Sequence, residues 1–291
     1  MQLDIFEHSH DVILRNAVID ALNCRDTEMS CKAVAALAAE YSSDILLPHM
    51  NRLCQHLAAG ALPSRLDPES AETILRQMEE TLLPAAKSLL GLSAASWLLP
   101  FWRELAASMT DIPFDPRGIH PHAAPLWLRS NDWKSAIACI NTIPAWHRQP
   151  LPLEWMIEAE SHLSGAKIIW PLIAEFAWMA PGRTRTLMDR LNLPVTKRLI
   201  ARFDAEFDGN EDSSENDFAW FPAWCLIAEG DLIECLKSVQ RGNDTPPERC
   251  TRLLIALLTL ERQGCHREIV ENRKKLRDVH PALFTLYMRN R

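Results

Sequence analysis

Glycine and tyrosine are scarce in this chain, with 9 Gly and 2 Tyr among 291 residues. The shortage of glycine argues against a phosphate-binding loop, and the sequence has no nucleophile elbow, P-loop, dinucleotide fingerprint or zinc-protease motif. The near absence of tyrosine, with no long stretch of strict apolar–polar alternation, argues against a β-sheet protein. We therefore expect no cofactor, and no motif supports an enzyme.

The cysteines lack the spacing of a metal site, since none of the eight forms a CxxC pair, and no HxxxH pair occurs either. Most of them fall on apolar faces of predicted helices, so we expect buried free thiols in a reducing compartment. The first residues, MQLDIFEHSHD, are polar and acidic and do not resemble a secretory signal. These features predict a cytoplasmic protein.

Positive charge is also limited, because 31 Lys and Arg face 38 Asp and Glu, for a formal net charge of −7. A protein that coats nucleic acid needs a clustered basic face, so we expect no nucleic-acid partner. No apolar run reaches 18 residues without interruption, and we expect no membrane span.

The residues that are abundant favour helices, since Ala, Leu, Glu and Arg dominate the composition. Segment 126–181 is typical of two successive helical hairpins, with predicted turns at Asn131 and Gly165, 34 residues apart. Two further predicted turns, at Gly230 and Gly264, have the same spacing. A constant period of this length indicates a helical repeat.

Small and apolar residues follow these turns at matching distances. Ala136 and Cys235 each lie five residues after a turn, Ile140 and Val239 lie four residues further on, and Pro281 opens a later helix. This pattern resembles the tetratricopeptide (TPR) repeat, a helix–turn–helix of 34 residues with a turn glycine, a small residue five positions later and a terminal proline.

The chain departs from the TPR pattern at Asn131, which replaces a glycine, and at Trp170 and Ile269, where the family prefers alanine. The usual Trp-Leu-Gly-Tyr pattern of the first helix is absent. The resemblance implies a TPR-like α-solenoid, a curved stack of helix pairs whose concave face holds a peptide or a partner helix.

The sequence predicts an all-α fold in three parts. Residues 1–112 form an N-terminal helical bundle, 113–125 a proline-rich linker or crossover, and 126–291 the TPR-like repeats. Residues 204–217 carry seven acidic side chains and no basic one, which is typical of a solvated loop.

Tryptophan is the first candidate for a partner-binding residue. All ten lie between positions 97 and 224, and Trp can serve either as an interface anchor or as filling between helix layers. The candidate anchors are Trp127, Trp133, Trp155, Trp220 and Trp224. We expect Trp220 and Trp224, beside the acidic loop, to be the most exposed.

A basic cluster near the C-terminus is the second candidate. Residues 241–291 hold 11 Lys and Arg against 6 Asp and Glu, and Arg273, Lys274, Lys275 and Arg277 lie together. They form either a solvated helix face or a docking patch for an acidic partner or for the chain's own acidic loop.

A metal site is the third possibility, because Glu154, Glu158 and His162 share one helix face at a spacing of four residues. Such a site needs further ligands that no motif supplies, so we expect a solvated helix face and no metal.

These features favour a non-catalytic scaffold or adaptor that binds a protein partner in a helical groove. One alternative is a regulatory helical domain with a Trp-lined apolar pocket for a small molecule. Another is a metal-dependent enzyme at Glu158 and His162.

Overall fold

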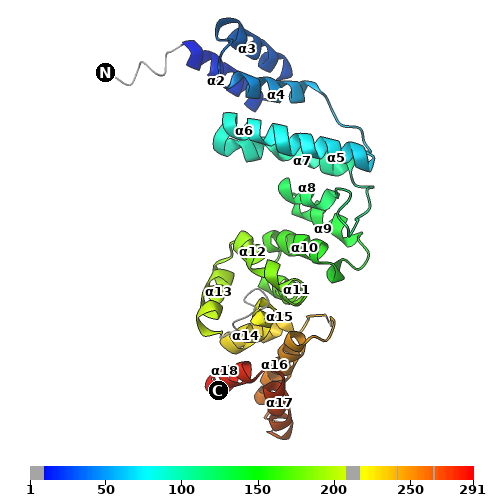
Figure 1. Ribbon diagram of the computed structural model, residues 1–291, viewed down its shortest axis with the longest axis vertical. Helices are drawn as coiled ribbons and strands as arrows, with labels where there is room; N and C mark the ends of the chain where they lie inside the picture. The colour runs from blue at the N-terminus through cyan, green and yellow to red at the C-terminus, as the bar shows by residue number, and fades with distance from the viewer. Residues whose placement is uncertain (1–9, 208–216, 241, 265) are drawn as a thin grey trace, which may run out of the picture. The chain divides into compact units, whose positions relative to one another are not determined.

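The computed structural model describes residues 10–207, 217–240, 242–264 and 266–291. This part of the chain is 78% helical and contains no strand, so the predicted all-α fold is confirmed (Figure 1). Two compact units make up the chain, Met1–Ser135 (unit 1) and Ala136–Arg291 (unit 2). Most of the predicted acidic loop 204–217 lies outside the described residues.

Helices of unit 1 pack largely in chain order, with α2 against α3, α3 against α4, α4 against α6, α6 against α7 and α7 against α8. Their bounds are α2 (His10–Asn23), α3 (Thr27–Glu40), α4 (Leu47–Ala58), α5 (Pro68–Gln77), α6 (Leu83–Leu90), α7 (Ala94–Ser108) and α8 (Ala123–Arg129). Residues 109–122 join α7 to α8, two helices that pack against each other, so the last three residues of the predicted proline-rich stretch 113–125 belong to α8.

A π-helical turn, Met78–Leu82, connects α5 to α6 and results from Pro84. Proline has no amide hydrogen, and its ring collides with the carbonyl four residues earlier in a regular α-helix. The wider turn avoids this conflict, because the Leu83 N–H bonds back to the Met78 carbonyl over five residues. The sequence leads us to expect a kink or a split at Pro84, and the helix instead continues through a local change of pitch.

The helical stretch Pro68–Ser108 contains an 18-residue window that is apolar enough to cross a membrane by length and composition alone. In the structure, 44% of that window is buried inside the fold. Core helices of folded domains pass the same test. This window is not an uninterrupted apolar run, so the expectation of no membrane span stays a prediction.

Side chains cap α3, α5 and α8 in the described part of unit 1. Asp26 accepts the Met29 N–H at the start of α3, and Asp67 accepts the Ser70 N–H at the start of α5. The predicted helix start at Asp67 is thus confirmed. At α8 the cap is His122, whose Nδ1 accepts the Ala124 N–H at 3.2 Å.

Helices of unit 2 pack as consecutive pairs, including α10 with α11 and α16 with α17. Their bounds, together with those of α9, which begins in unit 1, are α9 (Trp133–Asn141), α10 (Pro150–Leu163), α11 (Ala166–Met179), α12 (Pro181–Leu191), α13 (Pro194–Glu206), α14 (Phe221–Ala228), α15 (Ile233–Leu236), α16 (Pro246–Gln263), α17 (His266–Val279) and α18 (Pro281–Arg289).

The four predicted turns all lie between helices, as expected. Asn131 separates α8 from α9, Gly165 precedes α11, Gly230 follows α14, and Gly264 ends α16. Asn131 and Gly264 have φ values of 57° and 78°, a left-handed conformation that asparagine and glycine tolerate best. These turns follow local sequence signals, which is why they could be predicted.

Aromatic rings form the centre of the core of unit 2. Trp224 is 1% exposed, and its ring lies 5.4 Å from Phe203 and 6.1 Å from Phe221 between ring centroids. The expectation that Trp224 is exposed is therefore wrong. It lies on α14, a helix whose first six residues are all buried, so its large apolar surface fills the core.

The buried cap of α8 makes stability depend on pH. Burial lowers the pKa of His122 from 6.5 to about 4. The unfolded chain therefore takes up this proton near pH 6.5, whereas the folded chain resists it until near pH 4. The contribution to stability is complete above pH 6.5 and is lost as the pH falls, by on the order of 2 kcal/mol at about pH 5.

We expect His122→Asn to reduce this loss, because an asparagine oxygen can cap α8 without titrating. Urea unfolding followed by circular dichroism at pH 7 and pH 5 gives the comparison. The wild-type midpoint should fall more than that of the variant, and an equal fall in both proteins would contradict the assignment.

Candidate functional site

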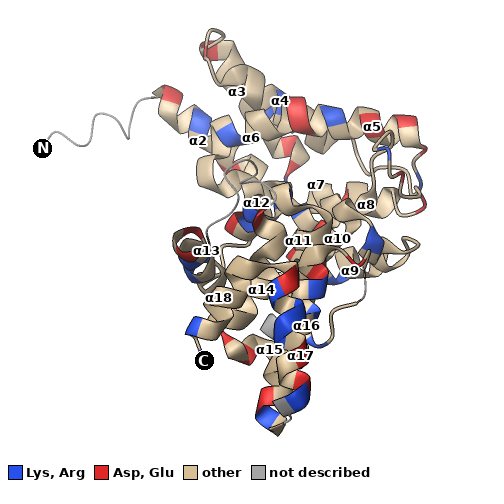
Figure 2. Ribbon diagram, turned by 60° about the horizontal axis from the view of Figure 1, so that its bottom comes forward, with Lys and Arg blue, Asp and Glu red and all other residues tan. Residues whose placement is uncertain are grey.

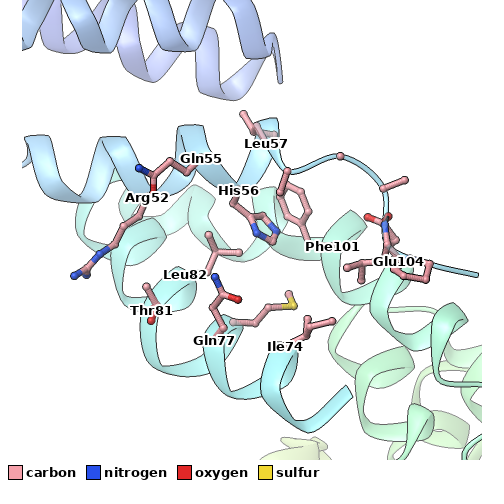
Figure 3. Close-up of a pocket in the computed structure, with 16 residues that line it drawn as sticks. Arg52, Gln55, His56, Leu57, Ile74, Gln77, Thr81, Leu82, Phe101 and Glu104 are labelled. Carbon is pink, nitrogen blue, oxygen red and sulfur yellow. Dashed lines mark hydrogen bonds between the residues drawn. The ribbon is translucent and has the colours of Figure 1, made fainter. Parts of the chain in front are cut away.

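Unit 1 contains a groove of about 820 Å³. Four segments line it, among them the loop 59–63 after α4, and Figure 3 shows their side chains converging on it. Residues 52–57 come from the end of α4, residues 74–82 from α5 and the π-helical turn, and Phe101 and Glu104 from α7. We call this cavity the α4–α7 groove.

The groove forms between the π-helical turn before Pro84 and the C-terminal end of α4. The π-helical turn that accommodates Pro84 contributes Met78, Thr81 and Leu82 to the groove. Opposite, α4 ends at Ala58, and Gly60 takes a φ of 77° that turns the chain away from the helix axis. The groove therefore lies where two helices depart from regular geometry.

The loop between α4 and α5 is fixed to α7 at two points. Glu104 accepts the Leu62 N–H at Oε1 over 2.6 Å, and the Ser108 carbonyl accepts the Leu66 N–H over 3.0 Å. A carboxylate that accepts a backbone N–H makes one of the stronger hydrogen bonds in a protein. The rim of the groove is thus held in place by α7.

His56 lies inside the groove with its ring against Phe101, at 4.6 Å between centroids and an interplanar angle of 68° (Figure 3). Burial lowers the pKa of His56, and the negative charge of Glu104 partly offsets this effect. Arg25 also stacks on Phe101, with its Cζ 4.9 Å from the ring centroid. The imidazole is consequently neutral at pH 7 and can donate and accept hydrogen bonds.

Three polar side chains of the groove are exposed, namely Arg52, Gln55 and Gln77. Within the described part of the chain, none of the three has a hydrogen-bond or ion-pair partner on its side chain. The lining also contains apolar side chains, among them Ile74, which is half-buried and forms part of what we call the apolar floor. The groove therefore combines an apolar floor with polar groups that remain available to a ligand.

A second, smaller cavity of about 170 Å³ lies in unit 2. Two buried polar atoms at its lining, Trp178 Nε1 and Thr245 Oγ1, have no hydrogen-bond partner among the described residues. Glu175 also lines it and accepts the Gln240 N–H at 2.8 Å. Burial raises the pKa of Glu175, and the nearby charge of Glu248 adds to the rise.

The start of α16 differs from the sequence-based expectation in the role of Glu248. The sequence Thr245-Pro246-Pro247-Glu248 predicts a capping box, in which the threonine hydroxyl caps the helix. In the structure the hydroxyl makes no cap. Glu248 instead accepts the N–H groups of Gly242 and Asp244, each at 2.8 Å.

The predicted tryptophan candidates do not gather at either cavity. Trp127, Trp133, Trp155 and Trp220 are all half-buried, and Trp127 and Trp133 belong to unit 1 whereas the others belong to unit 2. Trp220 packs on His280 at 4.3 Å between ring centroids. Their role as partner anchors stays a prediction.

The basic cluster lies on α17, where Figure 2 shows Lys and Arg residues along the helix. Arg273 is used inside the fold, because it donates to the Tyr287 hydroxyl at 3.3 Å and to Glu261 at 3.0 Å. Lys274, Lys275 and Arg277 are exposed. A docking role therefore stays a prediction for these three residues, and Arg273 also has a structural task.

The helix face with Glu154, Glu158 and His162 is less solvated than the sequence indicates. Glu154 is 8% exposed and binds both Arg183 and Arg190, and Arg190 also reaches Glu158 at 3.1 Å. The expectation of a fully solvated face is wrong for Glu154, because an ion-pair network to α12 covers it. Within the described residues, no group of three or more His, Cys, Asp or Glu side chains could hold a metal ion.

Comparisons with models of known protein families, with curated proteins and with solved structures find no match for this chain. Sequence reasoning missed the α4–α7 groove, although two signals pointed toward it: Pro84 within a helical pattern, and the break Gly60-Ala61-Leu62-Pro63 after α4.

We expect Glu104→Ala to release the loop, because the partly buried Leu62 N–H loses its acceptor. The free energy of unfolding should fall by about 1–3 kcal/mol. Hydrogen exchange at Leu62 should accelerate, and the pKa of His56, followed by NMR, should fall further. Glu80→Ala, which removes an exposed carboxylate of the π-helical turn, is the control, and equal protection of Leu62 in both variants would refute the role of Glu104.

Proposed function

We propose that this protein is a non-catalytic scaffold that binds a peptide segment of a partner protein in the α4–α7 groove. The observation that supports this proposal is the combination of an apolar floor with a rim of unpartnered amide and guanidinium groups. A peptide needs both, because its backbone requires hydrogen-bond partners while an apolar side chain anchors it.

The rim amides suit peptide backbone in particular. Gln55 and Gln77 each offer an acceptor oxygen and two N–H donors, which matches the alternating carbonyl and N–H groups of an extended chain. The neutral imidazole of His56 adds one donor and one acceptor inside the groove. Hydrogen bonds of this kind go to the partner's backbone and therefore do not depend on its side chains.

Charge favours a partner with basic residues beside its anchor. Residues 1–112 hold 8 Lys and Arg against 15 Asp and Glu, so this part of the chain carries a net negative charge as a whole. Complementary charge accelerates encounter and suppresses binding of acidic competitors.

We further propose that the helix pairs form a TPR-like array and that the protein acts in the cytoplasm. Helix pairs α10–α11 and α16–α17, which turn at residues 165 and 264, support the first proposal. Buried Ala136 and Cys235, the small residues expected after two of the turns, also support it. The half-buried tryptophans would then be additional contact residues along the array.

The test of peptide binding uses the full chain with a photo-crosslinking amino acid at Gln77, irradiated in cells of the source organism. The captured segment is sequenced, synthesised with a fluorophore and titrated against purified variants. We expect Ile74→Glu to raise the Kd at least about tenfold, equivalent to ~1.4 kcal/mol, because it places a charge on the apolar floor.

The control is Ile45→Glu, an isoleucine that is 83% exposed and lies outside the groove. This variant should bind as tightly as the wild type. Crosslinks scattered over unrelated segments, or equal affinities for the Ile74 and Ile45 variants, would overturn the proposal.

A second candidate function rests on the cavity of unit 2, a binding site for a small regulatory molecule. A ligand with acceptor atoms could accept hydrogen bonds from the unpartnered Trp178 N–H and Thr245 hydroxyl. A donor group on the ligand could bond to the Glu175 carboxyl. An unpaired buried polar group costs stability, so a ligand that pairs it gains affinity.

Native mass spectrometry of the purified full chain tests this candidate. We expect a bound small molecule that Trp178→Phe weakens by about tenfold, since the variant keeps the ring and loses only the N–H. Trp127→Phe in unit 1 should leave binding unchanged. A ligand-free spectrum from gently purified protein would remove this candidate.

A further inference from the structure

Two cysteines from different helices meet in unit 1. The Sγ atoms of Cys31 on α3 and Cys54 on α4 lie 2.7 Å apart, less than 1 Å longer than the about 2.05 Å of a disulfide bond. Small adjustments of the two side chains therefore suffice to join them, because α3 and α4 already pack against each other. Within the described residues, no other pair of cysteine sulfur atoms is in contact.

The two thiols differ in their surroundings. Cys31 is exposed to solvent, whereas Cys54 is 5% exposed. Burial, with the Cys31 thiol beside it, raises the pKa of Cys54 to about 12. Cys54 therefore stays protonated and shielded from solvent. Cys31 is the sulfur that an oxidant in solution reaches first.

We propose that Cys31 and Cys54 form a reversible disulfide when the protein meets a peroxide, and that this bond locks α3 to α4. The sequence alone leads us to expect inert buried thiols, and that expectation fits Cys139, Cys225 and Cys250, which are buried. The α3–α4 pair combines one accessible and one buried sulfur, which is the arrangement of an attacking and a resolving cysteine.

The reaction proceeds in two balanced steps. The Cys31 thiolate attacks one peroxide oxygen, the O–O bond breaks, and the released hydroxide takes up a proton as water, which leaves Cys31 as a sulfenic acid. The Cys54 sulfur then attacks the Cys31 sulfur, the S–O bond breaks, and the departing hydroxide takes the Cys54 proton as a second water. Hydrogen peroxide is the oxidant, and the two sulfurs together supply two electrons.

Proximity offsets the high pKa of Cys54 in the second step. The two sulfurs are held in contact by helix packing, so the attack is intramolecular and needs no diffusion. The hydroxide that leaves Cys31 removes the Cys54 proton within the same site, and no external base is required.

The disulfide has a consequence for α4, which also carries the wall of the α4–α7 groove. Gln55 and His56 directly follow Cys54 in this helix. A disulfide between α3 and α4 restrains that wall. It also makes a covalent loop of the chain between residues 31 and 54, which reduces the entropy of the unfolded state. The disulfide itself does not depend on whether the groove binds a peptide.

The test treats the reduced full chain with hydrogen peroxide near equimolar concentration, blocks remaining thiols by alkylation and maps peptides without reduction. We expect a Cys31–Cys54 linked peptide that disappears after treatment with dithiothreitol. We also expect the oxidised protein to unfold at a Tm at least about 5 °C higher than the reduced protein. Cys24→Ser, which removes the other exposed cysteine described, should leave both results unchanged.

Two variants keep the test decisive. Cys54→Ser should trap the sulfenic acid on Cys31, detectable with a dimedone probe. Cys31→Ser, a change at an exposed position that preserves the fold, should leave Cys54 unmodified. Oxidation of Cys31 to sulfinic or sulfonic acid in the wild type without a link to Cys54, or a link between other cysteines, would overturn the proposal.

Discussion

The missing amide hydrogen of Pro84 is the constraint on which the α4–α7 groove depends. A regular α-helix cannot pass through this residue without losing a hydrogen bond and meeting a steric conflict. The chain resolves both problems with one π-helical turn, which widens the helix where it faces the end of α4. Without that turn, Thr81 and its neighbours would take different directions, and one wall of the groove would be lost.

Several charged residues of unit 2 form ion pairs and hydrogen bonds between its helices. Glu154 joins α10 to α12, and Glu261 joins α16 to α17 and α18 through Arg273 and Tyr287. Breaking such a buried pair leaves an uncompensated charge, which costs more than the pair contributes. These residues therefore fix the relative positions of the helices, and the surface left for a partner is smaller than the charge count indicates.

Local features of this fold could be predicted from the sequence, and features that depend on distant residues could not. The helix start at Asp67-Pro68 and the turn at Gly264 follow from the chemistry of one or two residues. The burial of Trp224 depends on rings brought from α13 and α14, and a tryptophan suits a core as well as an interface. The groove combines residues 52–57 with Glu104, and no local periodicity links these segments.

The apolar stretch between Pro68 and Ser108 has a consequence for biosynthesis. As the chain leaves the ribosome, this stretch emerges before α8, one of the helices that later cover it. Helices α2 to α4 are already synthesised at that stage, and α4 packs against α6 and the π-helical turn. Because domains form their cores as the chain lengthens, docking on α4 can bury part of this stretch before α8 is synthesised.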